Sequence, residues 1–268
     1  MDKFVKLGQD MVLLWSKYKV MYWAGIWNTL KLAFLATLIG CFIGLLCGVL
    51  NTIPYTKKDP LPKRFLLKLL RIIIRIYVEV FRGTPMVLQS VFIYYGLPYF
   101  SNNALRFDNI FAAALLIVAI NTGAYMAESV RGGIISIDPG QTEGAKAIGM
   151  THVQTMLYVI LPQALRNIMP QIGNNLIINI KDSCVLSVIG VAELLYKTKS
   201  AAGALYMNFE TYTITMIVYF IMTFTCSRIL RWLENRMDGS DNYDLATTDT
   251  LAHTSGMYRY EEKKKEED

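Results

Sequence analysis

Residues 32–50 form a run of 19 positions without a single charged side chain. A helix that spans a membrane needs about 20 predominantly apolar residues. Similar apolar blocks recur along this chain of 268 residues, of which 53% are hydrophobic. One buried helix in a large soluble core would explain one such block, but not a series of them. The sequence therefore predicts an all-α, multi-pass membrane protein.

The apolar blocks predict about five transmembrane helices. They cover approximately residues 23–50, 84–100, 110–130, 172–191 and 212–233. The second is short and is interrupted by Pro85, Gly96 and Pro98, and the fourth contains Asn, Lys and Asp. An odd number of spans places the two termini on opposite sides of the membrane.

Basic residues predict which side each terminus occupies. With the N-terminus outside, 18 of the 27 Lys and Arg lie in cytoplasmic pieces (51–83, 131–171 and from 228 onward) and 7 lie outside. Cytoplasmic loops are enriched in Lys and Arg, so we expect an N-out, C-in protein of the cytoplasmic membrane. The net charge of +6 then reflects topology, and no nucleic-acid partner is expected.

The segments outside the spans differ in character. Residues 1–22 mix apolar and basic side chains and predict an amphipathic helix at the outer interface. Residues 23–235 form the transmembrane domain. Residues 236–268 lose their hydrophobicity, end in YEEKKKEED and are expected to be a disordered cytoplasmic tail.

Two helix faces have distinctive spacing. Gly40, Gly44 and Gly48 recur every fourth residue, which predicts a face where another helix approaches closely. Within residues 61–82, basic side chains recur along one side of a predicted helix. This pattern indicates an interfacial helix whose basic stripe faces anionic headgroups. A charged face exposed to solvent is the alternative. The stripe consists of Arg64, Lys68, Arg71, Arg75 and Arg82.

Metal and disulfide chemistry are not expected. The four cysteines all fall within predicted spans without metal-site spacing, and the two histidines are far apart in the sequence. No short apolar segment precedes a small-residue cleavage site, so the first span rather than a cleaved signal peptide is expected to direct insertion.

Residues 138–165 predict two capped helices between apolar spans. Asp138, Pro139 and Gln141 form a helix start, and Gly149 favours a helix end. Thr151 and Gln154 offer a second capping box. The second helix is expected to present Val153, Leu157 and Ile160 on one face and to stop before Pro162. Because this hairpin is too polar to cross the bilayer, it must rest on the membrane or against a partner at the cytoplasmic side. A plain connecting loop would not need two sets of caps, so the pattern favours a docking element.

This stretch resembles the cytoplasmic EAA loop of ABC importer permeases. That loop reads Glu-Ala-Ala, three residues, Gly, nine residues, Ile, one residue, Leu-Pro. Here the matching positions are Glu143, Ala145, Gly149, Leu161 and Pro162, whereas Gly144 replaces the first Ala and Val159 replaces Ile. The spacing is long and specific, and both replacements leave the register intact.

Four further segments resemble the branch of these permeases that transports polar amino acids. They are GIWNTLKLAF (25–34), VEVFRGTPMVLQSVFIYYGLP (78–98), AYMAESVRGGIISIDPGQTEGAKAIG (124–149) and NIKDSCVLSVIG (179–190). The likeness covers roughly residues 20–235. It implies a type I importer permease that works by alternating access.

The resemblance also implies partners. They are a second permease copy or paralogue, an ABC ATPase subunit, an extracytoplasmic amino-acid-binding protein, the amino-acid substrate and membrane lipid. The ATPase would bind Mg-ATP and dock on the loop through Glu143, Gly144, Ala145, Gly149, Leu161 and Pro162.

The chain itself is not expected to hydrolyse ATP or to bind a cofactor. The segment GAKAIGMT (144–151) has the glycine spacing of a phosphate loop, but Met150 stands where such a loop needs Lys. Energy must therefore come from a partner.

Polar residues inside the spans are candidates for the substrate pathway, because charge within a membrane usually faces a cavity or a partner. Lys181 and Asp182 offer one charge of each sign for an amino acid, although they could equally pair with each other or a neighbouring helix. Glu128 could form a pair with Arg131. The candidates are Asn121, Glu128, Asn174, Asn175, Lys181, Asp182 and Ser183.

A self-contained channel or secondary carrier for small polar solutes is the alternative function. Secondary carriers often show inverted repeats with ionisable residues at matching depths. No such repeat is visible in this sequence, and the capped hairpin would have no role in a carrier.

Overall fold

A computed structural model describes residues 2–55, 57 and 59–237. The predicted disordered tail from residue 238 onward lies outside the described residues. The chain divides into two units, Met1–Leu230 and Arg231–Asp268, and the candidate site lies within the first.

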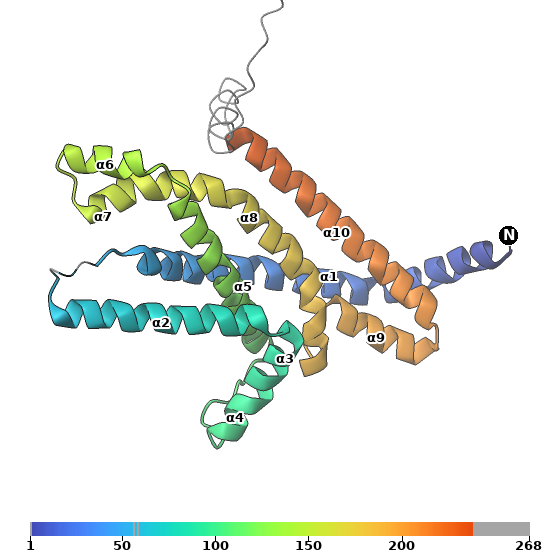
Figure 1. Ribbon diagram of the computed structural model, residues 1–268. Helices are drawn as coiled ribbons and strands as arrows, with labels where there is room; N and C mark the ends of the chain where they lie inside the picture. Colours follow the sequence, from blue (N-terminus) through green and yellow to red (C-terminus); the bar gives the residue numbers. More distant parts are fainter. Residues whose placement is uncertain (1, 56, 58, 238–268) are drawn as a thin grey trace, which may run out of the picture. The chain divides into compact units, whose positions relative to one another are not determined.

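The described residues form helices and contain no strand (Figure 1). The α-helices are α1 (Asp2–Thr52), α2 (Leu61–Gly83), α3 (Met86–Val91), α4 (Leu97–Phe100), α5 (Ile110–Ile135), α6 (Pro139–Ala147), α7 (His152–Gln154), α8 (Leu161–Asp182), α9 (Leu194–Leu205) and α10 (Asn208–Met237). Two π-helical segments (Phe92–Gly96 and Thr155–Ile160) and a 3-10 helix (Ser183–Ile189) continue neighbouring helices.

Three described helices, α1, α5 and α10, are long and apolar enough to cross a membrane. A fourth candidate is the bent pair His152–Ile189 and Leu194–Leu205, whose two parts meet at 54°. The structure thus supports three or four spans on length and composition. The count of five and the N-out orientation stay predictions.

The predicted span at residues 84–100 is a short helix that begins at Met86 and contains a π-helical segment. Residues 86–100 are helical and rise only about 22 Å, whereas the hydrocarbon core is about 30 Å thick. The chain breaks between α2 and α3 because Pro85 holds Thr84 in an extended conformation. The amide of Gln89 stabilises this break, since its Nε2 donates to the carbonyl oxygens of Phe81 and Thr84 at 2.9 and 2.8 Å.

The basic helix α2 packs against α5 and does not lie apart from the other helices. The hydroxyl of Tyr77 donates to the carbonyl oxygen of Ile120 in α5 at 2.6 Å. Leu67 and Ile74 are buried, while the opposite side exposes apolar residues such as Ile73 and Ile76.

Helix α1 is continuous from Asp2 to Thr52. The helix expected within residues 1–22 therefore runs into the first span without a break. Its placement at the membrane interface stays a prediction.

The glycines of α1 lie against α5. A Cβ added to Gly40 would lie 2.6 Å from the Cβ of Thr122, and one added to Gly48 would lie 2.5 Å from Cγ1 of Val130. Real Cβ atoms essentially never approach so closely. The repeat of glycines thus allows the two helix backbones to approach, and it brings α1 and α5 together (Figure 1).

A buried polar cluster joins three helices near this contact. Asn179 of α8 donates from Nδ2 to the hydroxyl oxygens of Thr37 in α1 and Thr122 in α5, at 2.8 and 3.0 Å. All three side chains are buried. Because hydrocarbon offers no competing partners, such bonds define how the helices fit together.

Replacing Asn179 by alanine is expected to destabilise the protein by about 1–2 kcal/mol, because two interhelical hydrogen bonds are lost. Thermal unfolding in detergent measures the effect. Asn174→Ala is the matched control on the same helix, because Asn174 is exposed. Equal melting temperatures for the two variants would contradict this role.

Candidate functional site

The capped hairpin predicted at residues 138–165 begins with α6. The carboxylate of Asp138 accepts a hydrogen bond from the backbone N–H of Gly140 at 2.6 Å. The side chain of Gln141 does not complete a capping box, since its Oε1 accepts from Nε2 of Gln163 in α8 at 3.4 Å. That bond ties the two arms of the hairpin together.

Within α6 the EAA-like residues take different positions. Ala145 is buried, with 6% of its surface exposed, whereas Glu143 and Gly144 face outward. A Cβ at Gly144 would meet nothing within 4 Å. The helix therefore packs through Ala145 and leaves Glu143 free to contact another molecule.

Gly149 forms the turn of the hairpin with a backbone φ of +83°. Its N–H bonds to the carbonyl of Lys146, and the N–H of Met150 bonds to the carbonyl of Ala145. This pair of bonds is the Schellman motif, in which glycine accepts the left-handed conformation without strain. The geometry explains why glycine occurs at this position.

The second arm starts with the predicted capping box. Thr151 accepts from the N–H of Gln154 at 3.3 Å, and the Gln154 side chain accepts from the N–H of Thr151 at 2.8 Å. Both ends of the turn are thus fixed by local hydrogen bonds. The hairpin is defined mainly by its own sequence.

The prediction that this arm stops before Pro162 is wrong. The helix continues through Pro162 to Asp182. A proline inside an α-helix removes one hydrogen bond and crowds the carbonyl one turn earlier, but here the wider π-helical turn Thr155–Ile160 precedes it. Gln163 also donates from Nε2 to the carbonyl of Val159 at 2.7 Å.

The same π-helical turn changes which residues share a face. Ile160 was predicted to lie beside Val153 and Leu157, but it is buried at 5% exposure. Val153 and Leu157 stay exposed, as do Ile148 and Tyr158. The hairpin thus presents exposed apolar side chains around its turn, which is typical of an interaction site.

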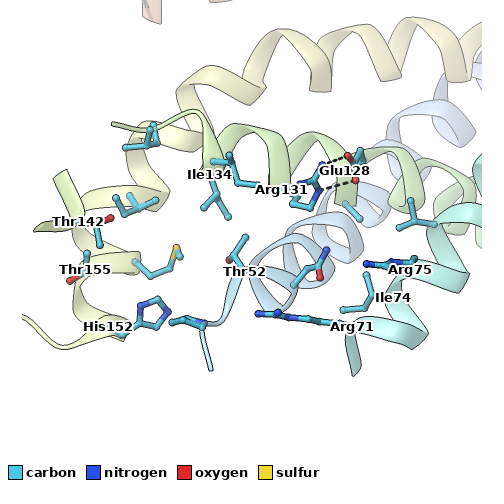
Figure 2. Close-up of a pocket in the computed structure, with 18 of the residues that line it drawn as sticks. Thr52, Arg71, Ile74, Arg75, Glu128, Arg131, Ile134, Thr142, His152 and Thr155 are labelled. Atoms are coloured by element: carbon cyan, nitrogen blue, oxygen red, sulfur yellow. Dashed lines mark hydrogen bonds and ion pairs between the residues drawn. The ribbon is translucent and has the colours of Figure 1, made fainter. Parts of the chain in front are cut away.

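A cavity of about 860 Å³ lies between the hairpin, α2, α5 and the end of α1. Figure 2 shows Arg71 and Arg75 of α2, the Glu128–Arg131 pair of α5, and Thr142, His152 and Thr155 of the hairpin around it. The hairpin therefore forms one wall of a cavity whose other walls are α2 and the candidate membrane helices α1 and α5.

The structure brings only one predicted pathway residue to this cavity. Glu128 lines it and pairs with Arg131 at 2.5 Å, so the local pair foreseen as an alternative is present. Asn121 instead donates from Nδ2 to Oε1 of Gln89 at 2.9 Å and supports the break between α2 and α3.

The other candidates lie along α8 and at the start of the 3-10 helix that follows it, and they do not converge. Asn175 is buried and contacts Sδ of Met126 at 3.0 Å, and the buried Ser183 hydroxyl donates to the carbonyl of Ile180. Asn174, Lys181 and Asp182 are exposed. Their roles in a substrate pathway stay predictions.

Two buried polar residues were missed. Asn179 is described above. Glu193 is fully buried and caps α9, since its carboxylate accepts from the N–H groups of Leu195 and Tyr196 and from the Tyr219 hydroxyl. An acid just before a helical pattern is a cap signal that could have identified Glu193. No group of three or more potential metal ligands occurs among the described residues.

Comparisons with known proteins show the family to which the chain is related. Residues 60–239 match the family described as "Binding-protein-dependent transport system inner membrane component". The chain is 38% identical over 222 residues to the glutamine transport system permease protein GlnP of Escherichia coli (strain K12), covering 80% of this chain and 97% of GlnP. It is 32% identical to the arginine transport system permease protein ArtQ of Bacillus subtilis (strain 168), covering 81% and 92%.

Solved structures show the same fold. A chain of a crystal structure of an amino acid ABC transporter with histidines matches with a TM-score of 0.72 at 38% identity, covering 84% of this chain and 97% of that one. The MetNI methionine ABC transporter in an inward facing conformation matches with a TM-score of 0.60 at 21% identity, covering 80% and 97%. The second likeness concerns the fold alone.

Proposed function

We propose that this chain, which belongs to the family of binding-protein-dependent transport system inner membrane components, is the permease subunit of an ATP-driven importer of polar amino acids. The proposal names two working parts. The α6–α7 hairpin docks on a separate ABC ATPase, and the transmembrane helices form the pathway together with a second permease subunit.

The observation that supports docking most directly is the exposed, capped hairpin. Its turn is fixed by Gly149 at φ +83°, and apolar side chains surround it. A hairpin fixed by its own caps can transmit motion as a rigid unit, because its shape does not depend on the partner. Glu143, Gly144, Ala145, Gly149, Leu161 and Pro162 are the proposed coupling residues.

Energy conversion belongs to the partner. In transporters of this family, a separate subunit hydrolyses ATP. We propose that closure of the ATPase dimer moves the hairpin, and with it α8, which continues the second arm without interruption to Asp182. An extracytoplasmic binding protein would deliver the amino acid.

The substrate class is proposed from the relatives. GlnP and ArtQ are named for glutamine and arginine, which are both polar amino acids. Glutamine is the first substrate to test, because the identity to GlnP is higher.

Uptake into proteoliposomes tests the function. The chain is reconstituted with its ATPase, permease partner and binding protein, and labelled glutamine and arginine are supplied outside. Accumulation that requires ATP and is insensitive to ion gradients is expected. Uptake driven by a proton or sodium gradient without ATP would instead support a secondary carrier.

Replacing Asp182 by alanine is expected to weaken substrate-stimulated ATP hydrolysis several-fold if this exposed carboxylate faces the pathway, because it would no longer attract the substrate ammonium group. The measurement is ATPase rate against substrate concentration in proteoliposomes. Basal hydrolysis without substrate serves as the control. Unchanged stimulation at every substrate concentration would exclude Asp182 from the pathway.

A further inference from the structure

We propose that the cavity between α2, α5 and the hairpin binds a phosphate-bearing anion. This site is distinct from the docking surface of the hairpin, and it does not depend on which amino acid is transported. The proposal rests on the charge of the cavity walls, on the position of Arg71 and on the size of the space.

The lining of the cavity is strongly basic. Three of the five members of the stripe on α2 line it, namely Arg71, Arg75 and Arg82, and the two others do not. Arg131 and Lys146 add basic groups from α5 and α6, whereas the carboxylates are Glu79 and Glu128.

Those two carboxylates leave most of the positive charge unbalanced. The two ion pairs found in the described part of the chain are Lys63–Asp59 and Arg131–Glu128. Within the cavity, the charge of Glu128 is therefore already compensated by Arg131. Glu79 remains as the single other acid opposite four basic side chains.

Arg71 is held in place with part of its guanidinium unused. Its Nη2 donates to the carbonyl oxygen of Ile53 at 2.6 Å, and the guanidinium lies 4.6 Å from the ring centroid of Tyr55. Its Nε is buried and has no hydrogen-bond partner. The Nη2 bond and the ring contact thus hold Arg71 at the cavity wall, and no ion pair within the described residues neutralises its charge.

The size and placement of the cavity favour phosphate. The cavity volume of about 860 Å³ lies in the range of small-ligand sites. An Arg guanidinium can donate two parallel hydrogen bonds to two oxygens of one phosphate. Basic pockets between membrane helices commonly bind anionic headgroups. An anion here would contact α2, α5 and α6 at once, and would thus connect the membrane helices to the hairpin.

Native mass spectrometry of the detergent-purified complex tests the site. The probes are dioleoylphosphatidylglycerol and inorganic phosphate, with dioleoylphosphatidylcholine as the zwitterionic reference. The cavity variant is Arg75→Gln with Lys146→Gln. The control variant is Arg64→Gln with Lys68→Gln, which removes the same amount of charge from the part of the stripe that lies outside the cavity. No hydrogen bond or ion pair within the described residues involves these four side chains.

Losing two basic contacts is expected to weaken anion binding about 30-fold in the cavity variant, and to leave the control variant close to the unmodified protein. A loss confined to phosphatidylglycerol identifies a lipid headgroup as the occupant, whereas a loss confined to inorganic phosphate identifies a soluble anion. The proposal would be overturned if the cavity variant and the control variant lost anion binding equally. It would also be overturned if the unmodified protein bound no inorganic phosphate and did not prefer phosphatidylglycerol over phosphatidylcholine.

Discussion

Replacing Gly149 by valine is expected to reduce ATP-driven uptake strongly while the protein remains inserted in the membrane. At φ +83° a β-branched side chain is a conformational outlier, and the strain amounts to about 1–2 kcal/mol or more. The Schellman bonds from Gly149 and Met150 would have to open to relieve it. The turn that presents the apolar tip of the hairpin would then lose its shape.

Uptake by proteoliposomes is expected to fall about tenfold or more, since a shift of this size changes the population of the docking conformation by that factor. Gly149→Asn is the comparison variant, because asparagine tolerates the left-handed conformation. This variant is expected to retain most of the uptake activity. Gly203→Val controls for a bulky residue at an exposed glycine without neighbours. Normal uptake by the Gly149→Val protein would contradict the docking role.

Replacing Gly44 by leucine is expected to destabilise the folded protein strongly. A Cβ at this position would lie 2.8 Å from the carbonyl carbon of Met126 and 2.9 Å from the nitrogen of Ala127. These are backbone atoms, which cannot rotate away as a side chain can. The leucine side chain can therefore be accommodated only if α1 and α5 move apart along their contact.

Overpacking of a core costs about 1–3 kcal/mol, and the cost is larger where backbone must move. The melting temperature in detergent is accordingly expected to fall by about 5–10 °C or more, with much of the protein aggregated. Gly132→Leu on α5 is the matched control, because a Cβ there meets nothing within 4 Å. Similar melting temperatures for the two variants would show that the contact between α1 and α5 is not tight.

The features predicted well were those determined by neighbouring residues. The cap at Asp138, the turn at Gly149 and the box formed by Thr151 and Gln154 each depend on a few adjacent positions. Their geometry is therefore visible in the sequence pattern. The glycine repeat of α1 behaves similarly, since only residues of this size permit the close approach found at Gly40 and Gly48.

The features missed depend on contacts that no local pattern contains. Pro162 suggested a helix end, but the π-helical turn before it, together with Gln163, accommodates the ring. Polar composition pointed to Asn174 and Asn175, although the residue that joins three helices is Asn179, one turn further along. Composition identifies polar residues in a span, but only the packing shows which of them face a neighbouring helix.

The basic stripe of α2 illustrates the same limit. Its spacing placed all five residues on one helix face, and a headgroup-facing helix followed from that. The structure divides the stripe, with Arg71, Arg75 and Arg82 at the cavity and the other two outside it. The spacing of the basic residues along α2 does not contain this division, because it depends on where the cavity lies along the helix.

The central claim is that the hairpin docks a separate ATPase. Gentle detergent purification of the full chain from its native membrane, followed by mass spectrometry, tests it most directly. A stoichiometric ABC ATPase is expected in the purified complex. It is expected to be absent from the complex of the Gly149→Val protein and present in that of the Gly203→Val protein. Repeated isolation of the chain without any ATPase, under conditions that preserve other ABC complexes, would contradict the account and favour a self-contained carrier.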